Sequence, residues 1–421
     1  STSKELALQL AHKADSAIVN GQPLGKLHGL PITIKDFLKV KDFTITRGCL
    51  GFKDNYCTDD ASIVKKLKAE GAIVLGITNM PELGPCFETA NDIYGQTNNP
   101  YDLSKTPGGS SGGEAAIIAS CGSAAGIGGD AGGSIRVPAH YSGIAGIKPT
   151  QHLLPSTGNV TPDGGFSMMF CMAGPMARYV EDLRLILPII SGADGIDPQI
   201  VPITPPAINS KPLKQMRIAY YMGHNKAFPE ADTIKTLENT IHCLNDNGFA
   251  VEMLEALDIF SIGQFHFDTY FYGGDQGLSL IKILQRLGVK KPSAMLQNFL
   301  DAALQAEPFD VTELRRRLVE VDQIRMKSLF LMQDFDILIC PTCTTPAKPH
   351  GTTQKDIEHI YYSAAFNLLG WPATTVRLGT SSMGLPIGLQ IVSKPWCDYD
   401  SLLVAEFLQN QLGGWQMPKL I

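Results

Sequence analysis

The residue types that could carry out chemistry gather between positions 104 and 148, where Gly, Ala and Ser dominate and charged residues are scarce. One segment reads Thr106-Pro-Gly-Gly-Ser110-Ser111-Gly-Gly-Glu114, and a second reads Gly126-Ile-Gly-Gly-Asp130-Ala-Gly-Gly-Ser134-Ile-Arg136. Such a block could serve three kinds of chemistry. These are nucleotide binding, a serine nucleophile on a tight turn, and a pair of serines served by a lysine.

Nucleotide binding is the weakest of the three. Gly126-x-Gly128-x-x-Ala131 meets the loose dinucleotide fingerprint, which also needs a preceding strand, a long following helix and an acidic residue about 20 positions later. Pro138 interrupts the following helix, and Lys148-Pro149 stands near the later position. The sequence also lacks a lysine-bearing phosphate loop. We therefore expect no nucleotide cofactor.

A nucleophile elbow is the second alternative. Gly108-Gly-Ser110-Ser-Gly112 matches G-x-S-x-G, which exposes a serine where a strand turns sharply into a helix. Residues 104–107, Ser-Lys-Thr-Pro, form a poor strand, so this alternative is less favoured. It stays open as the case in which Ser110 is the nucleophile.

The third alternative coincides with a known family. Ser134 follows Ser110 by 24 positions, and upstream lies Gly29-Leu-Pro-Ile-Thr-Ile-Lys35-Asp36. This combination resembles the amidase signature family, from about residue 20 to Gly384-Leu-Pro-Ile-Gly-Leu-Gln390. Five short segments resemble its animal fatty acid amide hydrolases in particular: Leu24–Pro31, Gly76–Asn79, Ile93–Gly95, Asn98–Asp102 and Gly413–Trp415.

The resemblance implies a role for three residues. Ser134 is then the nucleophile, Lys35 the base, and Ser110, with a cis peptide bond, the relay between them. Elementary chemistry agrees, because a serine needs a neighbouring base and a lysine is a base only when its amine is neutral. Lys35 ends the apolar run Ile32-Thr33-Ile34, which offers little to solvate an ammonium.

The segment around Ser134 also suggests how an oxyanion is stabilised. Ala131, Gly132, Gly133 and Ser134 offer consecutive backbone N–H groups, with side chains small enough for a carbonyl oxygen to approach. We predict that they form the oxyanion hole. Asp130 and Arg136 flank the nucleophile, and we predict a buried ion pair that shapes the loop.

Substrate-binding residues are expected from an aromatic cluster at positions 260–272. Phe265, Tyr270 and Phe271 are predicted to line an acyl channel, with ordinary core packing as the alternative. Phe87 falls where the resembled family builds its substrate pocket. Ser111 is predicted either to contact substrate or to cap the helix that begins near Ala115, with Glu114 near the positive end of that helix.

The remaining polar candidates are expected to be structural. His28 and His140 are predicted to be hydrogen-bonded histidines rather than members of a Ser-His pair. Cys340-x-x-Cys343 has no second ligand pair to match it, and the other seven cysteines have no framework spacing. We therefore expect reduced thiols and no metal.

The flanking segments predict an α/β layer. A helix is expected over residues 4–19 and another from an N-cap at Asp60 to residue 70, and strands are expected over 30–37 and 72–77. A Pro-rich link at 198–212 precedes a strand at 217–221 and several helices. Strands at 337–340 and 387–392 and a helix at 401–412 complete the chain.

Composition excludes other classes of protein. Hydrophobic residues make up 44% of 421 residues, so the chain folds around a core. The net charge of −6 is too weakly acidic to indicate a binder of nucleic acid or anionic membrane. A small neutral or apolar substrate fits better, and no apolar run is long enough to span a bilayer.

These observations predict one α/β domain over residues 1–421, with a mixed, mostly parallel twisted sheet between helix layers. Within it we expect a signature core at 20–185, a substrate-side segment at 205–335, and C-terminal strands and a helix at 336–421. The predicted activity is hydrolysis of carboxamides, with lipid-like amides or esters as substrates. A glutamine-using amidotransferase subunit that needs a partner and a non-catalytic binding protein are the alternatives.

The location and assembly follow from the same resemblance. We expect an intracellular protein, with membrane association through an N-terminal anchor, absent from this chain, as an alternative. Contact with a membrane surface and a homodimer stay open, and no nucleic-acid partner is expected.

Overall fold

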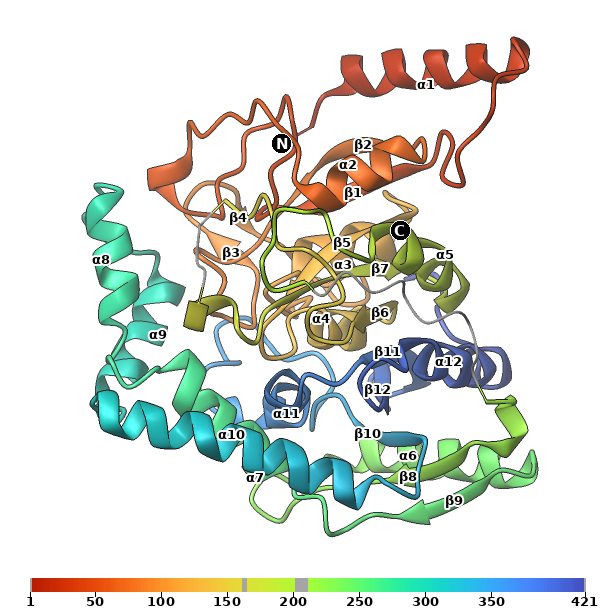
Figure 1. Ribbon diagram of the computed structural model, residues 1–421, viewed down its shortest axis with the longest axis vertical. Coiled ribbons are helices and arrows are strands. Elements are labelled where there is room, and N and C mark those ends of the chain that lie inside the picture. Colours follow the sequence, from red (N-terminus) through yellow and green to blue (C-terminus); the bar gives the residue numbers. More distant parts are fainter. Residues whose placement is uncertain (1, 161–164, 201–210, 420–421) are drawn as a thin grey trace.

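The computed structural model describes residues 2–160, 165–200 and 211–419 (Figure 1). Within these ranges, ten strands form one mixed sheet in the order β2-β1-β5-β7-β6-β11-β12-β10-β8-β9, and β3 pairs with β4 apart from it. The strands are β1 Pro31–Lys35, β2 Ile73–Thr78, β3 Ala90–Asn91, β4 Gly95–Gln96, β5 Ala125–Asp130, β6 Ala145–Lys148, β7 Met172–Ala177, β8 Arg217–Tyr220, β9 Ala250–Met253, β10 Ile337–Pro341, β11 Ala373–Thr380 and β12 Pro386–Ser393.

Helices cover both faces of the sheet. The α-helices are α1 Lys4–Val19, α2 Ser62–Ala69, α3 Gly112–Ala119, α4 Arg136–Tyr141, α5 Val180–Ile190, α6 Ala231–Asp246, α7 Ile259–His266, α8 Leu278–Arg286, α9 Ala294–Gln305, α10 Val311–Leu331, α11 Tyr361–Leu369 and α12 Asp398–Leu412. Short helical turns are η1 Leu50–Phe52, η2 Gly165–Met168, η3 Leu213–Gln215, η4 Phe267–Phe271 and η5 Ile357–Ile360. Together they complete a single α/β domain with a mixed sheet between helix layers, as the sequence predicts.

Strands from the first and the last parts of the sequence are neighbours in this sheet. Parallel pairs lie at the two outer parts of the sheet, β2-β1-β5 and β10-β8-β9, while the strands between them pair antiparallel. The C-terminal hairpin β11-β12 sits between β6 and β10, so late residues complete the centre of the sheet. The strand β1, which carries Lys35, lies between β2 and β5.

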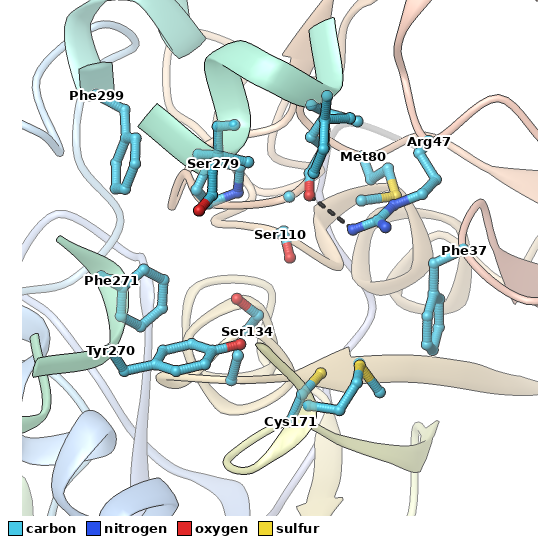
Figure 2. A pocket seen from close by; sticks show the side chains of 18 of the residues that line it. Phe37, Arg47, Met80, Ser110, Ser134, Cys171, Tyr270, Phe271, Ser279 and Phe299 are labelled. Atoms are coloured by element: carbon cyan, nitrogen blue, oxygen red, sulfur yellow. Dashed lines mark hydrogen bonds between the residues drawn. The ribbon is translucent and has the colours of Figure 1, made fainter. Parts of the chain in front are cut away.

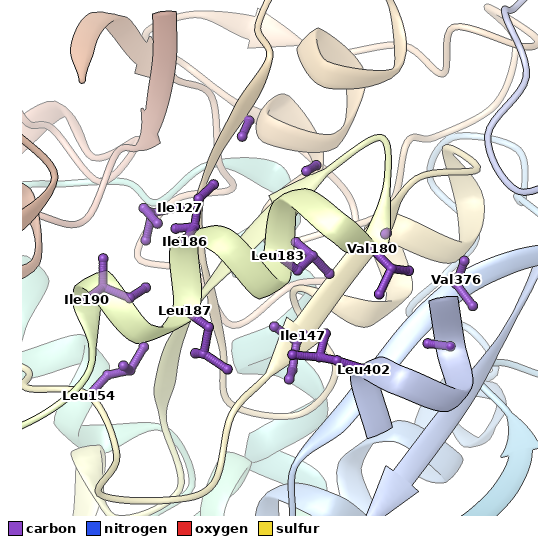
Figure 3. Packing of buried hydrophobic residues seen from close by; sticks show 14 of the residues in the cluster. Ile127, Ile147, Leu154, Val180, Leu183, Ile186, Leu187, Ile190, Val376 and Leu402 are labelled. Atoms are coloured by element: carbon purple, nitrogen blue, oxygen red, sulfur yellow. The ribbon is translucent and has the colours of Figure 1, made fainter. Parts of the chain in front are cut away.

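Apolar side chains lock the layers together. The inward face of α5 packs against Ile127 of β5, Ile147 of β6 and Leu402 of α12 (Figure 3). The α5 residues on this face are Val180, Leu183, Ile186, Leu187 and Ile190, which are 2% exposed or less. Burial of each such side chain contributes about 1.5–3 kcal/mol. This packing holds rigid the sheet whose other face carries α3 and α4.

The segment between β9 and β10 builds a separate wall. Figure 1 shows α8, α9 and α10, in teal and cyan, wrapped around one side of the molecule beside the strands β3 and β4. Leu284, Leu296 and Phe299 of α8 and α9 form a small core with Cys49 and Leu83 from the first part of the chain. The segment predicted at 205–335 therefore includes β8 and β9, which form one edge of the sheet, and this helical wall.

Most of the predicted elements occur close to their expected bounds, and the differences are informative. Asp60 does not cap α2, whose N-cap is Ala61, because the Asp60 carboxylate accepts the N–H of Lys41 and an ion pair from Lys68 instead. The predicted boundary near residue 205 lies within 201–210, outside the described residues. None of the helices in the described ranges has both the length and the apolarity needed to span a membrane.

Candidate active site

The lysine sits at the end of β1, where the strand meets the helix α3. Its Nζ lies 2.7 Å from the Ser110 Oγ and 2.9 Å from the Ser111 Oγ, and it donates to the Gly129 carbonyl at 3.3 Å. The side chain is 3% exposed, so the amine is held inside the protein. The structure thus brings together Lys35 and Ser110, two of the residues singled out from the sequence.

Burial controls the charge of this amine. Loss of hydration lowers the pKa of Lys35 to about 7, and the positive charge of Arg47 acts in the same direction. Cys171, Asp130 and Glu114 oppose the change without cancelling it. A large share of the molecules therefore holds a neutral amine near pH 7, which is the form that can accept a proton.

The neighbours of Lys35 also orient its lone pair. The Ser111 hydroxyl donates to the Gly129 carbonyl and accepts the Gly129 N–H, both at 3.2 Å, so one lone pair of its oxygen is left to accept from the lysine. A neutral amine has two hydrogens and one lone pair, and Ser111 and Gly129 offer acceptors for both hydrogens. The lone pair is then left facing Ser110.

The two serines meet in a cavity. Ser110 and Ser134 are each 4% exposed, and the Gly109-Ser110 peptide bond is cis, as the resemblance implied. Figure 2 shows both hydroxyls facing the same space. The Ser111 N–H donates to the Ser134 carbonyl at 3.1 Å, which fixes the two serine segments to each other.

A buried ion pair shapes the loop before Ser134. The Asp130 carboxylate accepts from the Arg136 guanidinium at 2.9 and 3.0 Å, and both side chains are fully buried. Arg136 also donates to Asn367 at 2.6 Å and Gln390 at 3.0 Å. Burial alone would raise the pKa of Asp130, but Arg136 holds it well below its usual range. The predicted structural pair is therefore present, and it is anchored to α11 and β12.

The backbone N–H groups near Ser134 do not all face the cavity. The N–H of Gly133 donates to the Asp130 carboxylate at 2.7 Å, so this member of the predicted oxyanion hole is already engaged. A Cβ on Gly132 would lie 2.6 Å from the Phe271 ring, so this ring closes over the loop. The N–H groups of Ala131, Gly132 and Ser134 stay the predicted donors to an oxyanion.

The cavity itself has a volume of about 250 Å³ and a largely apolar wall. Lys35, Ser110, Ser134 and Ala131 form its reactive end. Its far wall consists of residues from α8 and α9, namely Leu280, Ile283 and Phe299. Figure 2 shows Tyr270 and Phe271 on one side of the serines and Phe37 and Cys171 on the other. An elongated apolar group attached to a carbonyl suits such a space.

Of the five predicted substrate-binding residues, only Tyr270 and Phe271 line the cavity. Tyr270 and Phe271 line the cavity, whereas Phe87 packs behind it against Phe271, with ring centroids 6.0 Å apart. Phe265 of α7 is not among the residues that line the cavity, and the Arg317 guanidinium lies 5.5 Å from its ring centroid. Ser111 is fully buried, binds Lys35 and is not among the residues that line the cavity, so its contact with substrate stays a prediction.

The two histidines singled out from the sequence contact backbone groups, as predicted. The His140 Nδ1 accepts the Gly388 N–H at 2.7 Å, while Nε2 faces the Thr345 carbonyl at 2.9 Å, and burial lowers its pKa to about 4. His28 contacts the Ala14 carbonyl at 3.1 Å. Both histidines thus bond to backbone groups and lie outside the residues that line the cavity.

Sequence reasoning missed part of the cavity wall. Leu280 and Ile283 come from the amphipathic run 278–286, whose apolar spacing could have predicted a helix but not its partner. Cys171 faces the cavity from the start of β7, in a segment without a strand pattern. Long-range packing, which no local pattern encodes, brings these residues to the serines.

Comparison with known proteins agrees with this geometry. The family model named Amidase matches residues 1–402. The chain therefore belongs to the amidase family, whose members carry the amidase signature, and it is an amide hydrolase.

The chain is similar to several characterised proteins. It is 30% identical to fatty-acid amide hydrolase 2 of Homo sapiens, covering 93% of this chain and 76% of that protein. It is 31% identical to an indoleacetamide hydrolase of Bradyrhizobium diazoefficiens, covering 98% and 79%. It is also 29% identical to one subunit of the glutamyl-tRNA(Gln) amidotransferase of Koribacter versatilis, covering 98% and 90%.

Solved structures confirm the fold. A fatty acid amide hydrolase superposes with a TM-score of 0.87 at 24% identity, covering 98% of this chain and 78% of that one. A chain from a vestigial complex linked to the origins of an s-triazine catabolic enzyme gives a TM-score of 0.84 at 26% identity, covering 99% and 91%.

Proposed function

We propose that the protein is a serine amidase that cleaves lipid-like carboxamides through an acyl-enzyme on Ser134. The observation that carries this proposal is the buried Lys35 amine, 2.7 Å from Ser110 in the cavity that also contains Ser134. The neutral amine takes the proton of Ser110, and Ser110 takes that of Ser134. The Ser134 Oγ then attacks the carbonyl carbon, and the N–H groups of Ala131, Gly132 and Ser134 stabilise the oxyanion.

Collapse of the tetrahedral intermediate releases the amine. The proton held on Lys35 returns through Ser110 to the leaving nitrogen, and the C–N bond breaks. Water then attacks the acyl-enzyme by the same relay, which releases a carboxylic acid and restores the Ser134 hydroxyl. No metal or nucleotide takes part in this scheme.

The apolar cavity wall supports a lipid-like acyl group. Phe37, Phe271, Leu280, Ile283 and Phe299 would surround a hydrocarbon chain attached to the carbonyl at Ser134. The similarity to a fatty-acid amide hydrolase is in keeping with this substrate class. Contact with a membrane surface and homodimer formation stay predictions.

An amidotransferase subunit is the second candidate. The similarity to the glutamyl-tRNA(Gln) amidotransferase covers 90% of that subunit, more than the 76% of fatty-acid amide hydrolase 2. Such a protein would need a partner for its full reaction. The apolar side chains that α8 and α9 add to the wall favour the independent amidase, whereas Arg47 and Asp275, which also line the cavity, offer opposite charges that suit a charged substrate such as glutamine.

Labelling by a fluorophosphonate, followed by peptide mass spectrometry, tests the proposal. We expect the label on Ser134 in the wild-type chain and none on Ser134→Ala, which should also lose turnover. A label on Ser110 would favour the elbow mechanism, and no label with no turnover would favour a binding protein. Turnover of a series of amides of increasing acyl length by the isolated chain distinguishes the independent amidase from the amidotransferase.

A further inference from the structure

A second ionisable group, Glu114, lies one helical turn beyond Ser111 and is unused in the mechanism above. Its side chain is fully buried, and its carboxyl group contacts the Thr33 hydroxyl of β1 and the Thr78 hydroxyl of β2, the latter at 2.6 Å. Thr33 and Lys35 are two positions apart on β1 and so share a face of the strand. The contacts Ser111–Lys35 and Glu114–Thr33 are therefore neighbours between the same helix and the same strand.

The sheet leaves room for this carboxyl group. A Cβ placed on Gly126 of β5 would overlap the Glu114 Oε1, so the space exists only because position 126 has no side chain. Three strands thus accommodate Glu114, with two hydroxyls from β1 and β2 and a glycine from β5. An acidic residue that only capped a helix at the surface would need neither the two hydroxyl groups nor the glycine.

The surroundings of Glu114 contain few charges. Lys35 is the charged group that acts on it from β1, while α3 presents Ser111, β2 presents Thr78 and β5 presents Gly126. Asp130, further along β5, is neutralised by Arg136. Burial raises the pKa of Glu114 to about 7, although both threonine hydroxyls and Lys35 oppose this change.

Two protonation states of the pair hold the same number of protons. One is an ammonium with a carboxylate, and the other is a neutral amine with a carboxylic acid. Moving the proton from the Lys35 nitrogen to a Glu114 oxygen removes both charges from an interior where each charge is costly. The two threonine oxygens can accept as well as donate, so either can receive the hydrogen bond of a protonated carboxyl group.

We propose that Glu114 holds the proton that Lys35 lacks, so that near neutral pH the interior contains a carboxylic acid beside a neutral base. This inference rests on the proposed function for its consequence, since it explains how the base is ready without an alkaline environment. Glu114 is then a positioning residue: it acts on the reaction only through Lys35, whose amine it keeps neutral, and the mechanism gives it no contact with substrate.

A second cavity borders the two threonines that contact Glu114. The hollow has a volume of about 590 Å³ and is lined by Thr33 and Thr78, the two partners of Glu114. It reaches the surface at Leu103, which is 58% exposed. Glu114 itself does not line this hollow, so a proton from its carboxyl group would have to reach solvent through the Thr33 or Thr78 hydroxyl.

Difference infrared spectroscopy of the full chain tests the protonation state directly. We expect the carbonyl band of a protonated carboxylic acid at pH 7 in the wild type, its loss in Glu114→Gln, and its retention in Glu88→Gln. Glu88 is a matched control, because it is also buried but its carboxylate accepts the N–H groups of Gly351 and Thr353. Absence of the band from the wild type would overturn the proposal.

A second variant covers the case in which Glu114→Gln does not fold. Lys35→Met removes the amine, and the proposal predicts the same band in this variant as in the wild type. A band that is present in Lys35→Met and absent from the wild type would mean that Lys35 and Glu114 form a charged pair, and the proposal would be wrong.

The pH profile of kcat/KM is an independent test of the protonation state of Glu114. Glu114→Gln should keep the acid limb of the kcat/KM profile in place, because it replaces one neutral group by another. Removal of a carboxylate would instead move that limb down by about one to three pH units, which would contradict the inference. A wild-type chain that shows the band but no amide turnover would refute the proposed function and leave the protonation of Glu114 supported.

Discussion

At the scale of single residues, the site depends on side chains that do not react. Lys35 is the proposed base, yet Ser111 and the Gly129 carbonyl decide where its lone pair points. The hydrogen bond between Asp130 and Arg136 likewise fixes the conformation of the loop that carries Ser134. Positioning of this kind separates a buried lysine that can act as a base from one that cannot.

The pH dependence of turnover reports on Lys35. The neutral amine is the active form and its pKa is lowered to about 7, so kcat/KM should rise with pH through about 7 and then level off. Lys35→Ala should lower kcat/KM by roughly 100- to 10,000-fold, the usual contribution of a general base. Steady-state kinetics across pH 5 to about 9 measure both effects.

A second buried lysine provides the control for this prediction. Burial also lowers the pKa of Lys148 to about 7, but its amine donates to the Pro149 carbonyl and does not line the cavity. Lys148→Met should therefore keep the rise of kcat/KM with pH. Near-normal turnover by Lys35→Ala would rule out its role as the base.

Ser111 gives a prediction about orientation. Ser111→Ala removes one of the two acceptors for the amine hydrogens, so kcat should fall by roughly 100-fold while KM changes little. Ser120→Ala, at the other end of α3, is the control, because its hydroxyl bonds to the Ala116 carbonyl. An unchanged kcat in Ser111→Ala would show that the amine is held in place without it.

The sequence predicted these residues unevenly. The resemblance to the amidase signature family singled out the lysine and both serines, whereas the residue types and spacing alone left the nucleophile elbow on Ser110 open. The engagement of the Gly133 N–H with Asp130 and the contact of Ser111 with Lys35 were not predictable. Both depend on distances between segments that fold together only in three dimensions.

At the scale of elements, the helical wall of α8 and α9 decides what fits beside the serines. Leu280 and Ile283 of α8 and Phe299 of α9 line the far side of the cavity. The opposite face of α8 meets solvent, since Leu278 is 49% exposed. A substitution on the cavity face of α8 therefore tests selection of the acyl group, and a substitution on its exposed face is the control.

Enlarging Leu280 should shorten the accepted acyl chain. Leu280→Trp fills the far end of the cavity, so kcat/KM for a long-chain amide should fall by roughly tenfold or more, because overpacking costs about 1–3 kcal/mol. Turnover of a short-chain amide should change little. Leu278→Trp, on the exposed face, should affect neither substrate, and an equal loss for both amides in Leu280→Trp would argue against the acyl channel.

Elements with a strong pattern were predictable, and those without one were not. Residues 4–19 have helical spacing, and α1 spans Lys4–Val19. The strand β5 reads Ala-Gly-Ile-Gly-Gly-Asp, so it lacks the alternation of a typical strand and has Ile127 as its single β-branched residue. Its glycines are needed because Glu114, Ser111 and Phe37 approach the strand closely.

At the scale of the whole molecule, one buried network joins distant parts of the chain. Asp130 and Arg136 belong to the loop of the nucleophile, while Asn367 and Gln390 come from α11 and β12. Asn367 also donates to the Asp130 carbonyl at 3.1 Å. The stability of the domain and the shape of the site therefore depend on the same bonds.

Breaking this network should unfold the protein more easily. Asp130→Asn leaves the buried Arg136 charge uncompensated, so the free energy of unfolding should fall by roughly 3–5 kcal/mol. Chemical denaturation measures this value. Arg316→Ala removes an exposed ion pair with Glu313 and should leave the midpoint nearly unchanged. A similar midpoint shift in both variants would contradict a special role for the buried pair.

The place of Gln390 has a consequence for the timing of activity during synthesis. A ribosome must add Gln390 before the Arg136 guanidinium gains this partner, and the hairpin that carries Gln390 fills the middle of the sheet. A nascent chain can therefore contain all three proposed reactive side chains and still lack the hairpin β11-β12 and the Gln390 contact that help to align them. A chain that stops before Gln390 should therefore be inert, even though it contains Lys35, Ser110 and Ser134.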